Sequence, residues 1–300
     1  MSDPASSRHA KGLAITAIGG MILTIDIPLI RLAGGDLWPI LMVRSGMTVL
    51  AALVMWSVWR SISSKAPPLV PGRTGLIVAL LYALSGLCFI IAVYNTTTAD
   101  LVFILAFNSV FAALLSWVFL KERPKPATLL AMGAMIAGVA IIVGGGIGSG
   151  NLFGNAMALA TAFLLASALT VTRGSGRDMG FTALIAVAIP FVIAAFMTMR
   201  TGYRIEAPWW IILNGAVVMP IAFFCLSNGP KYISSPEVAM FYLLETVLAP
   251  VWVWMIFAEV PSQATLAGGA VLILTLIAHS LWQLRDGQRK RARGAIRHPV

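Results

Sequence analysis

Three ionisable residues lie deep within long apolar stretches of this 300-residue chain: Asp26, Arg44 and Glu245. An ionised group far from water requires a partner of opposite charge, a hydrogen-bond network or a bound solute. Side chains of these types can hold the amino and carboxylate groups of a small solute, or they can carry a proton. The chemistry that they indicate is recognition of charge inside an apolar environment.

Glu245 lies in the stretch 236–261, nine positions after Pro236. A helix rises about 1.5 Å per residue, so the carboxyl is expected near the middle of a span about 30 Å thick. Tyr242 shares its helical face. We predict that both contact a solute, and that Glu245 binds its amino group or a coupling proton. The alternative is a neutral glutamic acid hydrogen-bonded to a neighbouring helix.

Asp26 and Arg44 flank a turn that contains Gly34, Gly35 and Asp36. Asp26 lies ten positions before Asp36 and Arg44 lies eight after it, so on antiparallel helices the two share a depth. We therefore predict that they pair. Two roles remain open: a static salt bridge between two helices, or a site for the charged groups of a solute.

Further polar residues fall near the same depth when the other spans are counted in this way. Tyr82 and Asn108 are placed near the midplane with Glu245. Ser85, Asn155, Ser167 and Asn214 could add hydrogen bonds or satisfy kinked backbone. The candidate substrate-binding residues are Asp26, Arg44, Tyr82, Asn108, Tyr242 and Glu245.

No pattern in the sequence indicates catalysis. A Ser/His/Asp set, paired carboxylates, a phosphate-binding glycine loop and metal-ligand spacing are all missing, and Cys88 and Cys225 stand alone in apolar runs. We predict no enzyme activity, no cofactor and no metal. The competing hypotheses are a membrane-embedded enzyme acting on a lipid-linked substrate, and a passive channel.

The composition is that of a membrane protein. Hydrophobic residues make up 59% of the chain and charged residues 11%, against about 25% charged residues in soluble domains. The formal net charge is +10, but the basic residues lie in short segments between apolar runs, where they act as topology signals. The lipid bilayer is therefore the expected partner, and a nucleic acid is not.

Ten apolar runs are long enough to cross a bilayer as helices. They cover residues 12–33, 38–59, 74–94, 98–120, 126–144, 152–172, 180–199, 208–229, 237–257 and 263–283. With a cytoplasmic N-terminus, 17 of the 21 Lys and Arg residues fall on the cytoplasmic side. This predicts a multi-pass protein of the cell inner membrane with both termini in the cytoplasm, and the first span is expected to stay attached.

The two halves of the chain resemble each other at an offset of 137 residues. At this offset Asn108 falls on Glu245, Trp117 on Trp254, Glu122 on Glu259 and Pro124 on Pro261. Because each half has five spans, an odd number, the second half begins from the opposite side of the membrane. The prediction is an all-α membrane protein of ten transmembrane helices, arranged as two inverted five-helix repeats.

The segment ETVLAPVWVWMIFAEVP, with Glu259 and Pro261, resembles the end of the ninth helix in ten-helix EamA-type members of the drug/metabolite transporter superfamily. NSVFAALLSWVFLKERP, with Glu122 and Pro124, resembles the fourth-helix counterpart. Lys121 and Ala258 depart from the family, which often has Gly before the Glu. Known relatives include exporters of amino acids and other metabolites, and the likeness implies that a small organic solute passes between the halves.

The expected organisation follows from these observations. A cytoplasmic N-terminal tail (1–11) precedes the first repeat (12–144), a periplasmic linker (145–151), the second repeat (152–283) and a basic cytoplasmic tail (284–300) that is expected to be disordered. The function expected is secondary export of small organic metabolites, amino-acid-like solutes or drugs, by alternating access. A proton gradient and the solute's own gradient remain open as the driving force, and a monomer or weak dimer is expected.

Prolines inside the spans predict weak points in the helices. Pro28, Pro190, Pro220 and Pro250 each lack an N–H group and are expected to kink or loosen the helix that contains them. Such positions are suited to helices that move.

Overall fold

The computed structural model describes residues 4–62, 68–121, 123–145, 150–176, 179, 181–228, 232 and 235–297. Within these ranges it describes the backbone alone at 4–10, 227–228, 235–240, 242–243, 283–284 and 286–297. Statements about structure below refer to this part of the chain.

The described residues form helices joined by short turns, and they contain no strand. In chain order the helices are α1 (Pro4–Leu23), α2 (Asp26–Ala33), α3 (Leu37–Ile62), α4 (Gly72–Asn95), α5 (Thr98–Leu105), α6 (Asn108–Leu120), α7 (Pro126–Gly145), α8 (Leu152–Ser175), α9 (Thr182–Ala186), α10 (Ala188–Thr201), α11 (Pro208–Leu213), the π-helix η1 (Asn214–Val218), α12 (Met219–Asn228), α13 (Ser235–Phe257) and α14 (Gln263–Arg297). The predicted all-α fold is confirmed.

Nine helical stretches of the described chain are long and apolar enough to cross a membrane. A tenth apolar helix, Leu244–Phe257, is shorter and lies within the 23 residues of α13. The observed stretches coincide with the ten predicted ones to within a few residues at most ends. The exception is α14, which continues as a helix to Arg297, so the prediction of a disordered tail was wrong over residues 284–297. Its 35 residues rise about 52 Å, more than the thickness of a bilayer.

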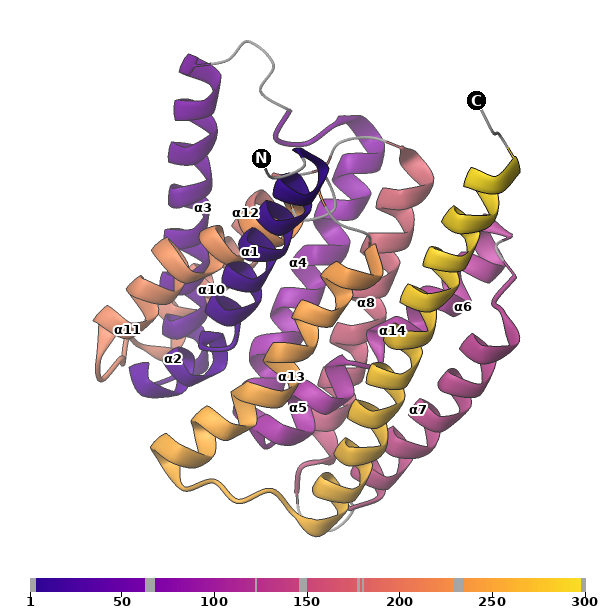
Figure 1. Ribbon diagram of the computed structural model, residues 1–300. Coiled ribbons are helices and arrows are strands. Elements are labelled where there is room, and N and C mark those ends of the chain that lie inside the picture. The colour runs from indigo at the N-terminus through magenta and orange to yellow at the C-terminus, as the bar shows by residue number, and fades with distance from the viewer. Residues whose placement is uncertain are drawn as a thin grey trace.

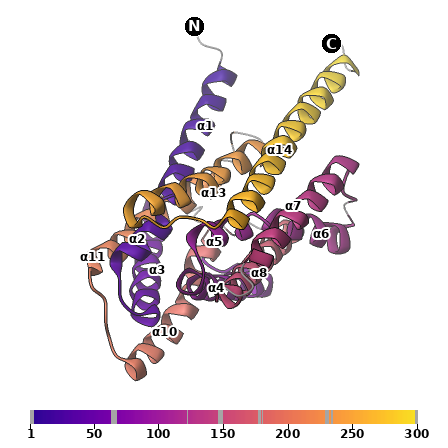
Figure 2. The same cartoon turned by 90° about the horizontal axis from the view of Figure 1, so that it is seen from below.

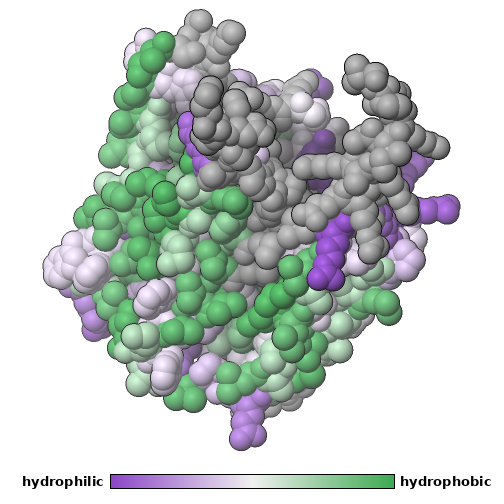
Figure 3. Space-filling model, viewed as in Figure 1, coloured by the Kyte–Doolittle hydropathy of each residue, from purple (hydrophilic) through white to green (hydrophobic). Residues whose placement is uncertain are grey.

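Both termini lie at the same end of the helical bundle (Figure 1). We call this the termini end, and we call the other the opposite end. The space-filling view shows a surface that is largely apolar over the helices, with hydrophilic side chains gathered toward its margins (Figure 3). Large apolar side chains such as Phe119 and Leu130 are more than 70% exposed, as expected for a surface that faces lipid.

The first membrane-spanning stretch is interrupted between α1 and α2. Pro28 sits in the first turn of α2, where its ring lacks an N–H group and would clash with the carbonyl group four residues earlier, that of Thr24. The backbone instead turns tightly, with the N–H of Thr24 donating to the carbonyl of Met21 at 3.2 Å. The break leaves Asp26 as the first residue of a new helix.

Two further interruptions have the same cause. Pro190 follows the break at Val187 between α9 and α10, and Pro220 follows the π-helix in the eighth span. Pro250 instead lies inside α13, which continues past it. The fourth span is also broken, between Leu105 and Asn108, although no proline is present there. The span predicted over 98–120 is therefore present, but it consists of two helices.

Helices at equivalent positions in the two halves pack in equivalent ways. The third span, α4, lies along the sixth, α8, and the eighth, α12, lies along the first, α1. The fifth and tenth spans, α7 and α14, lie side by side, as do the second and seventh, α3 and α10 (Figures 1 and 2). These contacts are preserved when the halves are exchanged, which is the arrangement expected of inverted repeats.

Lys121 and Ala258 adopt left-handed backbone conformations, with φ angles of 57° and 53°. They are the two non-glycine residues with positive φ in the described chain, and they lie at the ends of α6 and α13. A left-handed residue commonly ends a helix, and glycine is favoured there because it has no Cβ atom. This explains why the family pattern has glycine at these positions.

Replacing Ala258 with glycine is expected to stabilise the protein. Relief of the left-handed strain, partly offset by the larger backbone entropy of glycine in the unfolded chain, should raise the unfolding free energy by about 0.5–1 kcal/mol. The measurement is thermal unfolding in detergent, and a higher Tm is expected. Ala140→Gly, at an exposed position of α7, is the matched control and should lower Tm instead. A lower Tm for Ala258→Gly would contradict the explanation.

Candidate functional site

Asp26 and Arg44 form an ion pair between α2 and α3. Arg44 Nη2 donates to both carboxylate oxygens of Asp26, at 3.0 Å each. Both residues are buried, with 3% of Asp26 and 6% of Arg44 exposed. The predicted pairing is therefore present, and the break before α2 places the carboxylate where it meets α3.

Asn214 completes this pair into a closed network. Arg44 Nε donates to Asn214 Oδ1 at 3.0 Å, and Asn214 Nδ2 donates to Asp26 Oδ1 at 2.6 Å and to the Asp26 carbonyl at 3.1 Å. Asn214 is fully buried and is the first residue of the π-helix η1. Short π-helical segments occur frequently at functional sites, because they reorient side chains within an otherwise regular helix. Side chains from both halves thus meet at one charged centre.

The approach of η1 to α3 depends on Gly215. A Cβ atom at this position would clash with the Arg44 carbonyl oxygen, so only glycine permits the observed backbone contact. Thr48 Oγ1 donates to the Gly215 carbonyl at 3.0 Å across the same contact. The network of Asp26, Arg44 and Asn214 is therefore held by closely packed backbone on at least one side.

Phe89 and Met219 line the guanidinium group of Arg44. The guanidinium carbon lies 5.5 Å from the centre of the Phe89 ring, and Nη2 lies 3.2 Å from the Met219 sulfur. No hydrogen bond among the described residues involves the other terminal nitrogen, Nη1. Arg44 thus uses Nε and Nη2 within the protein and keeps one nitrogen available to another acceptor.

Glu245 on α13 lies within electrostatic range of both Asp26 and Arg44. Trp252, two turns further along α13, donates from Nε1 to Thr24 Oγ1 at 3.1 Å and so joins α13 to the break in the first span. The centre contains two carboxyl groups and one guanidinium group. With both carboxyls ionised its charge would be −1, which a proton or a solute cation can neutralise.

The other three predicted residues differ in their placement. Tyr82 packs beside the buried cluster of Val78, Ala168 and Met179, and no hydrogen bond among the described residues joins it to the Asp26–Arg44 pair. Asn108 begins α6 after the break in the fourth span, and no described hydrogen bond joins it to the charged centre. Tyr242 lies within α13, but its side chain is outside the described part of the chain.

Three residues at the centre were not predicted as site residues from the sequence: Asn214, Phe89 and Met219. Asn214 was noted as a polar residue that could equally satisfy kinked backbone, and the helix distortion was indicated by Pro220. Phe89 and Met219 lie in apolar runs among many similar residues. Nothing in the sequence distinguishes them, because their role depends on which helix faces Arg44.

Comparison with known proteins identifies the chain's relatives. Residues 10–144 match the EamA-like transporter family. The pseudopaline exporter CntI of Pseudomonas aeruginosa, in strains UCBPP-PA14 and PAO1, is 22% identical over 237 residues, which is 78% of this chain and 82% of the exporter.

A solved crystal structure superimposes with a TM-score of 0.64 at 15% identity, covering 91% of this chain and 98% of the other, and this likeness shows the fold. The match over residues 10–144 and the likeness to the pseudopaline exporter together support a membrane transporter of the drug/metabolite transporter superfamily.

Proposed function

We propose that this protein exports small amino-acid-like metabolites across the cell inner membrane by alternating access, with the centre at Asp26, Arg44 and Glu245 as its substrate site. The observation that carries the proposal is the buried network of Asp26, Arg44 and Asn214, which joins the two halves and has Glu245 within electrostatic range. Buried ionisable groups in transporters commonly mark the solute path, and this one lies between inverted halves.

The chemistry of the centre favours a solute with both an amino and a carboxylate group. Arg44 Nη1 can donate to a carboxylate, while Glu245 can accept from an ammonium group. The Phe89 ring and Met219 sulfur provide apolar surface beside the guanidinium for a side chain. A solute of this class would pair its carboxylate with Arg44 and its ammonium group with Glu245 at the same time.

The remaining predicted contacts stay part of the proposal. Tyr242 precedes Glu245 by one helical turn, which would bring its ring to the same face of α13. Tyr82 and Asn108 would then contact a solute at other stages of its passage, away from the charged centre. A substitution of either is expected to affect transport less than a substitution of Glu245.

The direction and orientation of transport are inferred from two separate observations. The relatives at 22% identity are named as exporters, which supports export here. The termini end would face the cytoplasm, because 17 of the 21 Lys and Arg residues fall there when the spans are counted. Protons or the solute's own gradient would supply the driving force.

The orientation predicts which exposed positions react with a membrane-impermeant thiol reagent in intact cells. In a background with Cys88 and Cys225 replaced by alanine, Thr201→Cys at the opposite end should be labelled. Ser61→Cys at the termini end should be labelled only after the membrane is permeabilised. Both residues are exposed, so accessibility of the side chain does not bias the comparison. The reverse pattern would place both termini outside.

Transport by purified protein in liposomes tests the function itself. We expect saturable flux of an amino-acid-like solute that is accelerated by unlabelled solute on the other side. Discrete single-channel conductance in place of saturable exchange would indicate a passive channel. Turnover of a lipid-linked substrate by the purified protein would favour a membrane-embedded enzyme.

A further inference from the structure

A second ion pair lies at the opposite end of the bundle and joins residues distant in sequence. Arg31 Nη1 donates to Glu259 Oε2 at 2.6 Å, and the backbone N–H of Thr98 donates to Glu259 Oε1 at 2.8 Å. Arg31 Nη2 also donates to the carbonyl of Thr96 at 3.2 Å. Glu259 thereby connects the end of the ninth span to the first and fourth spans.

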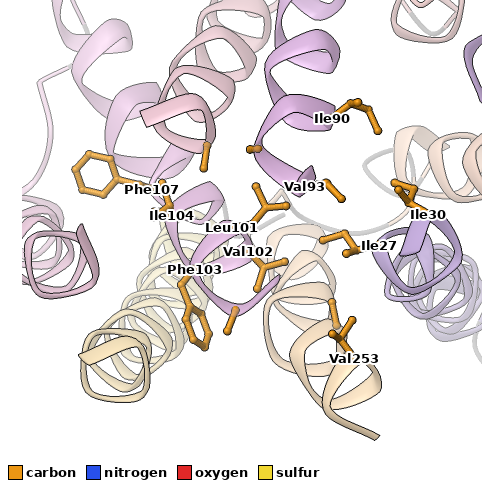
Figure 4. Close-up of a cluster of buried hydrophobic side chains, with 14 of the residues drawn as sticks. Ile27, Ile30, Ile90, Val93, Leu101, Val102, Phe103, Ile104, Phe107 and Val253 are labelled. Carbon is orange, nitrogen blue, oxygen red and sulfur yellow. The ribbon is translucent and has the colours of Figure 1, made fainter. Parts of the chain in front are cut away.

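An apolar layer separates this pair from the charged centre. Ile27 and Ile30 on α2 lie between Asp26 and Arg31 in the chain, and both are 1% exposed. Figure 4 shows them facing side chains from α4, α5 and α13, including Val93, Leu101 and Val253. These side chains are buried against one another, so passage of a solute from the centre to the opposite end requires these helices to separate.

The polar residues beside the ion pair are incompletely satisfied. Three buried atoms here have no hydrogen-bond partner among the described residues: Arg31 Nε, Thr98 Oγ1 and Asn155 Nδ2. A buried donor without a partner destabilises the arrangement that contains it, and water or a different neighbour would relieve this cost. Entry of water into this region would therefore favour an open arrangement over the closed one.

A cavity of about 340 Å³ borders the pair. Its lining includes Arg31, Glu259, Tyr94, Thr96 and Asn151, which come from both halves of the chain. The order along α2 is therefore charged centre, apolar layer, ion pair and polar cavity.

We propose that Arg31 and Glu259 form the gate at the opposite end of the transport path, and that the cavity that they line is the vestibule into which solute is released. The pair and the apolar layer separate together, because Ile30 and Arg31 are adjacent on α2, and Glu259 lies two residues after the end of α13, which contains Val253. This inference rests on the proposed transport function, although its test requires no knowledge of the solute.

The test measures the access of water to the apolar layer. Val253→Cys, in the background without Cys88 and Cys225, is 1% exposed in the closed arrangement and lies six residues before Glu259. Adding Glu259→Gln should accelerate its labelling by a membrane-impermeant thiol reagent in intact cells about fivefold, the size expected of a modest population shift. Thr201→Cys serves as the positive control for access from that side.

Glu206→Gln is the matched control, because Glu206 pairs with Arg204 at the same end at 3.9 Å but is highly exposed. It should leave the labelling rate of Val253→Cys unchanged. Because the labelling rate is measured without solute, its outcome is independent of the flux assay that tests the substrate site, so failure of the gate and failure of the substrate site can be told apart.

Unchanged or slower labelling of Val253→Cys in a folded Glu259→Gln variant would overturn the proposal that Arg31 and Glu259 form a gate. Should that variant fail to reach the membrane, the same labelling rate is measured in Arg31→Lys. Lysine keeps the charge, but it lacks the planar guanidinium group that donates to Glu259 and to the Thr96 carbonyl together.

Discussion

Arg44→Gln is expected to abolish transport and to destabilise the protein by about 3–5 kcal/mol, the range measured when one partner of a buried ion pair is removed. The substitution leaves the Asp26 carboxylate buried, with Asn214 as its remaining hydrogen-bond donor among the described residues. It also removes Nη1, the nitrogen that we assign to the solute's carboxylate. Thermal unfolding in detergent and flux in liposomes are the two measurements.

The double variant Asp26→Asn with Arg44→Gln separates the structural part of this effect from the functional part. It removes both charges, so it should unfold at a higher temperature than either single variant while still failing to transport. A double variant no more stable than the poorer single variant would contradict the mutual compensation. Recovery of transport together with stability would show that the pair is a static salt bridge.

Glu245→Gln is expected to reduce transport of amino-group-containing solutes by tenfold or more, with little loss of stability. Glutamine keeps the shape and hydrogen-bonding capacity of the side chain but removes the charge, and a hydrogen bond to a charged group is worth about 1.5–3 kcal/mol. Initial rates of uptake in liposomes across a range of pH give the result. The matched control is again the exposed Glu206→Gln, which should transport normally.

The pH dependence of this variant distinguishes the two roles proposed for Glu245. A residual exchange that no longer varies with pH would assign the carboxyl to a coupling proton. A large rise in KM at every pH would assign it to the solute's amino group. Normal kinetics with unchanged pH dependence would remove Glu245 from the transport path and favour a neutral residue that packs between helices.

Much of the fold follows from properties that are local along the chain. Hydropathy over about 20 residues locates each span, because the thickness of the bilayer sets the length that a helix must have. The interruptions near Pro28, Pro190 and Pro220 were also indicated, since proline removes a backbone donor whatever surrounds it. The break at Ala106 and Phe107 and the helical continuation to Arg297 have no such local signal in the sequence.

The pairing of Asp26 with Arg44 could be predicted because one short turn separates their helices and fixes their relative depth. Depth alone cannot say which way a side chain faces around its helix. Tyr82 and Asn108 were therefore grouped with Glu245 at one level, and the structure adds that Tyr82 packs beside the cluster of Val78, Ala168 and Met179.

The class of the protein, its apolar spans and the charged residues that need partners can all be read from the amino-acid sequence. Only the packing of the helices brings Asn214 to Asp26 and Arg44, over separations of 188 and 170 residues, and Arg31 to Glu259 over 228. The physical reason is that such contacts depend on the rotation and packing of whole helices, which no spacing within a single helix encodes.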